Sequence, residues 1–310
     1  MSGRLLLVNY HYIRPADYAH PGIHPIEPDA FAAEAEMLAA RFHMATPTEA
    51  EAFLLGRGDL PGDSILLTFD DGMLDHGRAA REVLDPLGVK GVFFVPSQPN
   101  VQGRGIMVHK MHWLRATTAP EDFRGAFLDA LNDSARTLEG DPGIAAKAEE
   151  VYVYDTPAVG WVKYLINFAL PYAAVDAVAD TMLAARGVSA ADFCRDLYMA
   201  PDEIRGLAEH GHLIGAHGSS HMPVTRLGDA LEADVGGNIA DLAGIVGARP
   251  MWLSYPYGRG DAIPEDTAAF CRQFDFTIGL TLDVGWNDGA GDPSRVKRIN
   301  TNEVARFVAD

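Results

Sequence analysis

Short apolar runs alternate along the chain with longer stretches in which apolar residues recur at helical spacing. The apolar runs are rich in β-branched and aromatic residues, as buried strands are; they cover 5–10, 64–69, 89–96, 212–217, 251–256 and 276–282. Helical spacing is found at 28–42, 76–87 and 201–210. Because strands that alternate with helices pair in parallel, the pattern predicts an α/β sheet or barrel.

One long region interrupts this alternation. From about 103 to 200 the strand pattern is absent and helical spacing dominates, as in "EDFRGAFLDALNDSARTLEG" and "WVKYLINFALPYAAVDAVADTMLAARG". No internal repeat, low-complexity segment or Pro/Gly-rich linker marks a domain boundary. We therefore expect one domain over 1–310 that carries a helical insertion at about 103–200. The insertion would serve as a lid, as a partner surface, including one for a homo-oligomer, or as additional core.

Composition narrows the classes of partner and location. Asp and Glu number 43 against 25 Lys and Arg, which gives a net charge of −18 and disfavours nucleic acid and anionic membranes as partners. Cys194 and Cys271 lie far apart without metal-type spacing, so we expect two buried free thiols. The start, "MSGRLLLVNYHYIRP", lacks a signal-peptide core and no apolar run is long enough for a membrane span, which predicts a cytoplasmic protein.

Candidate chemistry begins at the end of the second predicted strand. "LLTFDDGMLDHG" places Asp70 and Asp71 side by side where that strand stops, and by itself this pair is typical of a turn or helix cap. After the strand at 212–217 comes "HGSSH", in which His217 and His221 are four residues apart and can face the same way. Two histidines and one carboxylate form a metal site with open positions for water and substrate, which suits metal-assisted hydrolysis. The neighbouring acid could then accept a proton from water.

Several motifs together resemble a known family. "LLTFDDG", "GVKGVFFV", "EHGHLIGAHGSSH" and "SYPYG" occur in the order and strand context of the polysaccharide deacetylase superfamily, also called NodB-homology or carbohydrate esterase family 4. The resemblance covers roughly 1–100 and 201–300 and leaves the helical insertion outside. It implies a distorted, partly open (β/α)7 barrel of the TIM-like, NodB-homology type.

The resemblance also implies roles for particular residues. Asp70 would be the catalytic base, and Asp71, His217 and His221 would bind a divalent metal, with zinc expected first and cobalt, manganese or nickel as alternatives. The backbone N–H of Tyr257 in "SYPYG" would help to hold a tetrahedral oxyanion.

The chain departs from the family pattern at two places. The arginine that usually pairs with the catalytic acid, two residues before the proline of the third motif, is Ser254 here. The late motif with its histidine, which would protonate the leaving amine, is missing, because no histidine follows His221. Another group must therefore orient Asp70, and another must donate the proton.

Other residues are candidates for these missing parts. His11, in "NYHYIRP", ends the first predicted strand, where one branch of the superfamily has "YH". It is either a catalytic residue or a residue that only caps or packs. Arg298, in "VKRIN", resembles an arginine after the last strand of that branch and could hold the site acids, a substrate anion or a surface partner. His109, in "HKMH" at the start of the insertion, and Trp286, near the place of the family's fourth motif, are candidate substrate contacts.

These observations favour a metal-dependent hydrolase that removes an N-acyl group, expected to be acetyl, from an amino sugar or a sugar-containing precursor. A second hypothesis is a metal-dependent amidohydrolase acting on a linear or cyclic amide that is not a sugar, such as a ureide or imide. A third is a binding protein without activity on the same fold. The absence of GxSxG, GxxxxGK and GxGxxG motifs argues against serine-hydrolase, P-loop and dinucleotide chemistry.

Overall fold

The computed structural model describes residues 3–16, 24–131, 138, 141–152 and 156–308. Two compact units emerge from the contacts within the chain. The first comprises Met1–Pro15, Pro25–Gly103 and Cys194–Asp310, and the second comprises Ala16–His24 and Arg104–Phe193. The main segment of the second unit coincides with the predicted insertion, whereas the single-domain organisation stays a prediction.

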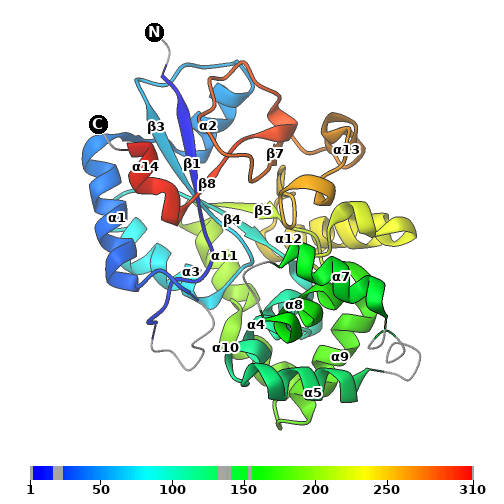
Figure 1. Ribbon diagram of the computed structural model, residues 1–310. Helices are drawn as coiled ribbons and strands as arrows, with labels where there is room; N and C mark the ends of the chain where they lie inside the picture. The colour runs from blue at the N-terminus through cyan, green and yellow to red at the C-terminus, as the bar shows by residue number, and fades with distance from the viewer. Residues whose placement is uncertain (1–2, 17–23, 132–137, 139–140, 153–155, 309–310) are drawn as a thin grey trace. The chain divides into compact units, whose positions relative to one another are not determined.

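The first unit is built on a parallel sheet in the order β7-β6-β5-β4-β3-β1-β8, with the short β2 paired to β3 (Figure 1). Its strands are β1 (Leu5–Tyr10), β2 (His43–Met44), β3 (Ser64–Phe69), β4 (Val92–Val95), β5 (Leu213–Ala216), β6 (Trp252–Ser254), β7 (Ile278–Leu280) and β8 (Ile299–Asn300). Every pairing between these strands is parallel. Among the described residues no strand pairing joins β7 to β8, so the predicted partly open (β/α) barrel is confirmed.

Helices surround this sheet in the first unit. They are α1 (Pro28–Arg41), α2 (Pro47–Leu54), α3 (Leu74–Ala79), α11 (Pro201–Glu209), α12 (Gly237–Val246), α13 (Thr267–Gln273) and α14 (Val304–Val308). Short π or 3-10 turns are η1 (Ala80–Leu84), η2 (Gln98–Gln102), η5 (Val224–Arg226), η6 (Gly228–Ala230), η7 (Glu232–Gly236), η8 (Gly260–Ala262), η9 (Pro293–Arg295) and η10 (Thr301–Glu303). The helix predicted at 76–87 is thus an α-helix that continues as a π turn.

Burial on both faces explains why the strands read as continuous apolar runs. Leu6 and Val8 of β1 pack in a core cluster with Phe31 of α1, while Leu5 and Leu7 point the other way, into a cluster that includes α2. All six residues of β1 are buried. Parallel sheets covered on both faces favour this composition. The two cysteines are buried and free, as predicted.

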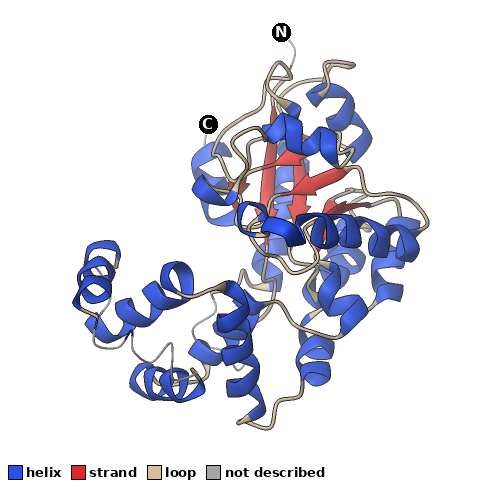
Figure 2. Ribbon diagram, turned by 90° about the vertical axis from the view of Figure 1, so that its right-hand side faces the viewer, coloured by secondary structure: helices blue, strands red, loops and turns tan. Residues whose placement is uncertain are grey.

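All the described secondary-structure elements of the second unit are helices (Figure 2). It contains α4 (Met107–Ala116), α5 (Pro120–Ala130), α7 (Pro142–Val151), α8 (Pro157–Tyr164), η4 (Leu165–Ala169) and α9 (Tyr172–Ala184), and α10 (Ala190–Leu197) spans the boundary between the units. None of the described helices has the length and apolar character needed to span a bilayer. The cellular location and homo-oligomer formation stay predictions.

Close packing between β4 and β5 makes Gly215 a sensitive position. Gly215 is the register partner of Phe94, and a Cβ at Gly215 would lie 2.4 Å from two carbons of the Phe94 ring. We expect Gly215→Ala to lower the free energy of unfolding by about 1–3 kcal/mol, because overpacking a buried site forces its neighbours to shift. Urea denaturation measures this loss.

Gly244→Ala is the matched control, because a Cβ at Gly244 in α12 meets nothing within 4 Å. Alanine is the better helix former there, so this variant should be at least as stable as the parent. Equal stability of the two variants would contradict the packing argument.

Candidate active site

The candidate residues follow the carboxyl ends of neighbouring parallel strands. Asp70 and Asp71 come directly after β3, and His217 directly after β5, with β4 paired between these two strands. The carboxyl ends of parallel strands meet at one edge of the sheet, where loops can vary while the strands stay rigid. Residues about 150 positions apart in sequence are brought together in this way.

Three buried side chains converge at this edge. Asp71 Oδ1 lies 3.2 Å from His217 Nε2 and 3.2 Å from His221 Nε2. One ligand atom from each of the three residues lies within 4.8 Å of the other two. This is the two-histidine, one-carboxylate set that the sequence pattern predicted.

The hydrogen bonding of His217 shows that the set fits a divalent cation. His217 Nδ1 lies 2.7 Å from the carbonyl oxygen of Ser254. Because a carbonyl oxygen can only accept, Nδ1 carries the proton, and in a neutral imidazole Nε2 then presents a lone pair. That lone pair faces the carboxylate oxygen of Asp71, an arrangement that a cation between them stabilises. A carbonyl on the far nitrogen is also the usual support of a metal-bound histidine.

The loop that carries the two histidines is held by side chains from the segment after it. Asn238 Oδ1 accepts a hydrogen bond from the His217 backbone N–H at 3.0 Å. The carboxylate of Asp234 accepts from the backbone N–H groups of Ser219 at 2.9 Å and Ser220 at 3.0 Å. The loop conformation is therefore fixed by the protein itself.

Left-handed backbone conformations concentrate at the site. Four described residues other than glycine have positive φ, and three of them are Asp71 (82°), His221 (58°) and Tyr257 (65°). Such conformations are uncommon for residues with a Cβ and persist where the surrounding structure enforces them. Their concentration here is typical of a functional site.

A buried ion pair holds Asp70. Arg298 Nη1 donates to Asp70 Oδ1 and Nη2 donates to Oδ2, both at 2.9 Å. Asn9 Nδ2 and Ser254 Oγ also donate to Oδ2, at 3.2 and 3.1 Å. Arg298 therefore supplies the guanidinium that the third motif lacks, and Ser254, which stands in the usual arginine position, contributes a further hydrogen bond.

The remaining donors of Arg298 are also used within the protein. Its Nε donates to the Thr281 carbonyl at 2.9 Å. Nη2 also donates to Ser254 Oγ at 2.8 Å, and Nη1 also donates to Asn9 Oδ1 at 3.2 Å. A guanidinium has five N–H groups, and all five have protein acceptors here. Of the predicted roles for Arg298, the geometry supports holding the site acid rather than contacting a substrate anion.

The charge environment keeps Asp70 ionised. Burial alone would raise the pKa of this carboxyl, but the positive charge of Arg298, together with His217, lowers it to about 2. Oδ1 accepts one hydrogen bond from the described residues, from Arg298, so a second acceptor direction on this oxygen remains.

His11 and Tyr257 lie beside the three converging residues. His11 Nε2 is 4.0 Å from Asp71 Oδ2, and the His11 side chain is 39% exposed. The ring centroid of Tyr257 lies 5.1 Å from that of His221. Partial removal of the Tyr257 phenol from water, reinforced by the negative charge of Asp71, raises its pKa to about 12, so this hydroxyl stays protonated.

Trp286 is not brought into this cluster. The guanidinium of Arg4 lies over its ring, 4.5 Å from the centroid, and the next residue, Asn287, pairs with Leu5 at the amino end of β1. His11 follows the carboxyl end of that strand, and five residue steps of a strand span roughly 16 Å. The predicted substrate contact by Trp286 therefore gains no support from the geometry.

His109 is buried in α4 of the second unit, where its ring lies 6.2 Å from that of His112. Its predicted contact with substrate stays a prediction.

Sequence reasoning missed the supporting residues Asn9, Asn238 and Asp234. Asn9 carried a usable signal, because it is a polar residue inside the apolar run of β1, and its side chain reaches Asp70. Asn238 and Asp234 had none, because a polar residue in a helical stretch is ordinary.

Comparisons with known proteins agree with this fold. A sequence profile described as polysaccharide deacetylase matches residues 171–279. The comparison with curated proteins found no match.

Several solved structures, two of them described as deacetylases, share the fold. IcaB from Ammonifex degensii aligns with a TM-score of 0.59 and 19% identity over 98% of this chain and 94% of that one. The deacetylase PplD of Streptococcus pyogenes, solved with acetate, aligns with a TM-score of 0.59 and 13% identity over 97% and 93% of the two chains. The BpsB deacetylase domain from Bordetella bronchiseptica gives 0.54 and 13% over 96% and 94%. The profile match confirms the resemblance to polysaccharide deacetylases over residues 171–279, a span that begins within the predicted insertion and does not include Asp70 or Asp71, and the solved structures show that the fold is shared.

Proposed function

We propose that this protein is a metal-dependent hydrolase that removes an N-acyl group, with acetyl expected first, from an amino sugar or a sugar-containing precursor. The observation that carries this proposal is the convergence of Asp71, His217 and His221 beside an ionised Asp70. The match to the polysaccharide deacetylase profile supports a carbohydrate substrate.

Asp71, His217 and His221 would hold the metal, for which zinc is the first choice because the donors are two imidazole nitrogens and a carboxylate oxygen. Cobalt, manganese and nickel are the alternatives. A divalent ion at such a site polarises an amide carbonyl and makes water more acidic.

Asp70 is the proposed base. Its low pKa keeps it charged at neutral pH, and Oδ1 retains an acceptor direction through which it can take a proton from the attacking water. Arg298 acts as a positioning residue, because its two parallel hydrogen bonds fix the plane of the carboxylate.

Tyr257 and His11 are proposed to complete the reaction. No described residue accepts a hydrogen bond from the backbone N–H of Tyr257, which leaves this group able to donate to a developing oxyanion. His11 is the partly exposed imidazole beside Asp71 and can donate a proton to the leaving amine in place of the missing late histidine.

Asp70→Asn tests the assignment of the base. Removing a general base lowers kcat by about 10²–10⁴-fold, whereas the substitution leaves the three proposed ligands in place, so metal binding should persist. Acetate release from N-acetylhexosamines and metal content per chain measure the two effects. Circular dichroism should confirm folding, because Arg298 loses its buried partner. A folded variant that deacylates as fast as the parent would overturn this role.

A substrate panel separates the sugar proposal from its rivals. The zinc-loaded protein is incubated with N-acylated sugars, nucleotide sugars and cyclic amides, with Asp70→Asn as the blank. Acyl release from sugars supports the proposal, and ring opening of cyclic amides alone would favour the non-sugar amidohydrolase. A chain that binds no metal and acts on none of these substrates would favour the binding protein.

A further inference from the structure

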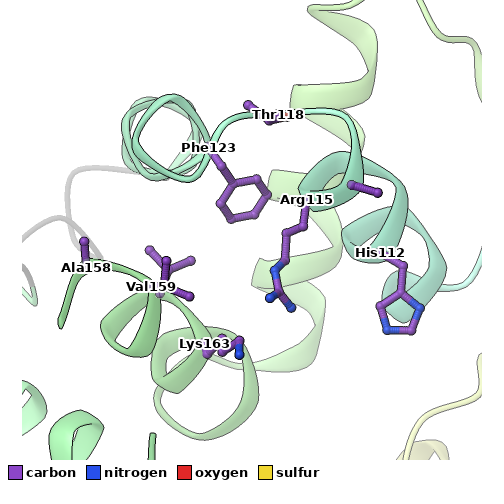
Figure 3. A pocket seen from close by; sticks show the side chains of 9 residues that line it. His112, Arg115, Thr118, Phe123, Ala158, Val159 and Lys163 are labelled. Carbon is purple, nitrogen blue, oxygen red and sulfur yellow. The ribbon is translucent and has the colours of Figure 1, made fainter. Parts of the chain in front are cut away.

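The second unit contains a cavity of about 260 Å³ between α4, α5 and α8 (Figure 3). Arg115 and His112 line it from α4, Phe123 from α5, and Val159 and Lys163 from α8. Figure 3 shows the Arg115 side chain and the Phe123 ring extending into the space between the three helices. This volume lies just below the roughly 300 Å³ at which pockets for drug-sized ligands start, so the cavity would accommodate only a smaller organic molecule.

The polar lining of this cavity is cationic. Arg115 and Lys163 are positively charged, His112 can become so, and none of the described residues that line the cavity is acidic. The chain as a whole carries 43 acidic residues against 25 Lys and Arg, so the lack of a carboxylate among the described lining residues is unexpected here. The Arg115 side chain has neither a hydrogen bond nor an ion pair with the described residues.

A further guanidinium stands behind the cavity wall. Thr118 lines the cavity and accepts a hydrogen bond from Arg186 Nη2, while Arg186 Nη1 donates to Thr117 Oγ1 at 2.9 Å. The Arg186 guanidinium also lies 6.0 Å from the centre of the Trp113 ring. Arg186 thus places a further positive charge next to the lining of the cavity, which favours an anionic occupant.

The remaining lining is apolar. Phe123, Val159 and Val162 face the same cavity, and Phe123 is 4% exposed. Apolar walls combined with a few convergent polar groups are typical of pockets for small molecules. An inorganic ion alone would make no favourable contact with these apolar walls.

We propose that this cavity binds a small organic anion. Its phosphate or carboxylate group would pair with Arg115 and Lys163, and its compact apolar part would pack against Phe123, Val159 and Val162. Arginine and lysine bind both kinds of oxyanion through charge-assisted hydrogen bonds. This binding site uses none of the residues of the proposed active site and does not depend on the proposed reaction.

Isothermal titration of the full chain tests the proposal with four probes: phenyl phosphate, benzoate, inorganic phosphate and uncharged benzyl alcohol. Both the zinc-loaded and the chelator-treated protein are titrated, because anions also coordinate metals. We expect saturable binding of phenyl phosphate or benzoate in both forms, weaker binding of inorganic phosphate, and none of benzyl alcohol. The stronger of the first two probes identifies the preferred head group.

Arg115→Gln and Lys163→Gln should each weaken binding by about tenfold or more, because each removes a charge-assisted hydrogen bond. Lys147→Gln is the matched control, since Lys147 is an exposed lysine of α7 outside the cavity lining. Circular dichroism should show the same fold for all three variants. Absence of saturable binding, equal binding by Arg115→Gln and the parent, or binding that vanishes with the metal would each overturn the proposal. None of these outcomes bears on deacylation by the active site.

Discussion

Arg298→Met is expected to lower the free energy of unfolding by about 3–5 kcal/mol, because it leaves the Asp70 carboxylate buried without its counter-ion. Arg298 is 1% exposed and Asp70 3% exposed, so solvent cannot replace the lost partner. Denaturation with guanidinium chloride measures the change. Deacylation should also fall, since the carboxylate loses the two hydrogen bonds that fix its plane.

Two further variants isolate the ion pair. In Asp70→Asn/Arg298→Met both charges are gone, so the double variant should be more stable than Arg298→Met alone. Arg295→Met is the control, because it breaks an exposed ion pair: the Arg295 and Asp283 side chains are 46% and 41% exposed. Exposed pairs contribute about 0–1 kcal/mol to the free energy of unfolding. A loss from Arg298→Met no larger than that from Arg295→Met would contradict the energetic importance of the buried pair.

Asp71→Ala and His217→Ala are expected to abolish tight binding of one divalent metal per chain and to lower kcat/KM for deacylation together. The ion's stabilisation of the transition state is worth several kcal/mol, which corresponds to at least about 10³-fold in rate. Metal content after dialysis and acetate release measure the two effects on the same samples.

His210→Ala serves as the control for histidine removal. Its side chain is 63% exposed and lies near Asp85, away from the three converging residues. This variant should retain both metal and activity. If Asp71→Ala held zinc as tightly as the parent does, the proposed ligand set would have to be abandoned.

The sequence predicted the central strands because burial on both faces leaves a continuous apolar run. The runs at 5–10 and 64–69 coincide with β1 and β3. Each of the other apolar runs contains a strand, but the observed strand is shorter than the run, as with β6 (Trp252–Ser254) within 251–256. Strands β2 and β8 have two residues each and were not predicted, since two residues carry no periodicity.

The convergence of Asp71, His217 and His221 could be predicted because each residue comes from a local motif at a strand end. The partner of Asp70 could not be settled in this way. Asp70 and Arg298 are 228 positions apart, and only the fold determines that Arg298, directly before β8, reaches the carboxylate of Asp70, directly after β3. For Trp286 the sequence misled. Its position along the chain resembled that of a site residue in the family, but the pairing of its neighbour Asn287 with Leu5 holds it near the amino end of β1, away from the site.

The left-handed backbone conformations of Asp71, His221 and Tyr257 limit which substitutions can stabilise the protein without loss of activity. Glycine would adopt these conformations without strain, so replacing any of the three by glycine relaxes the chain locally while deleting a ligand or a wall of the site. Selecting variants for thermal stability alone would therefore favour proteins that have lost activity. Improved thermostability has to be sought at positions remote from the strand ends, under continued selection for turnover.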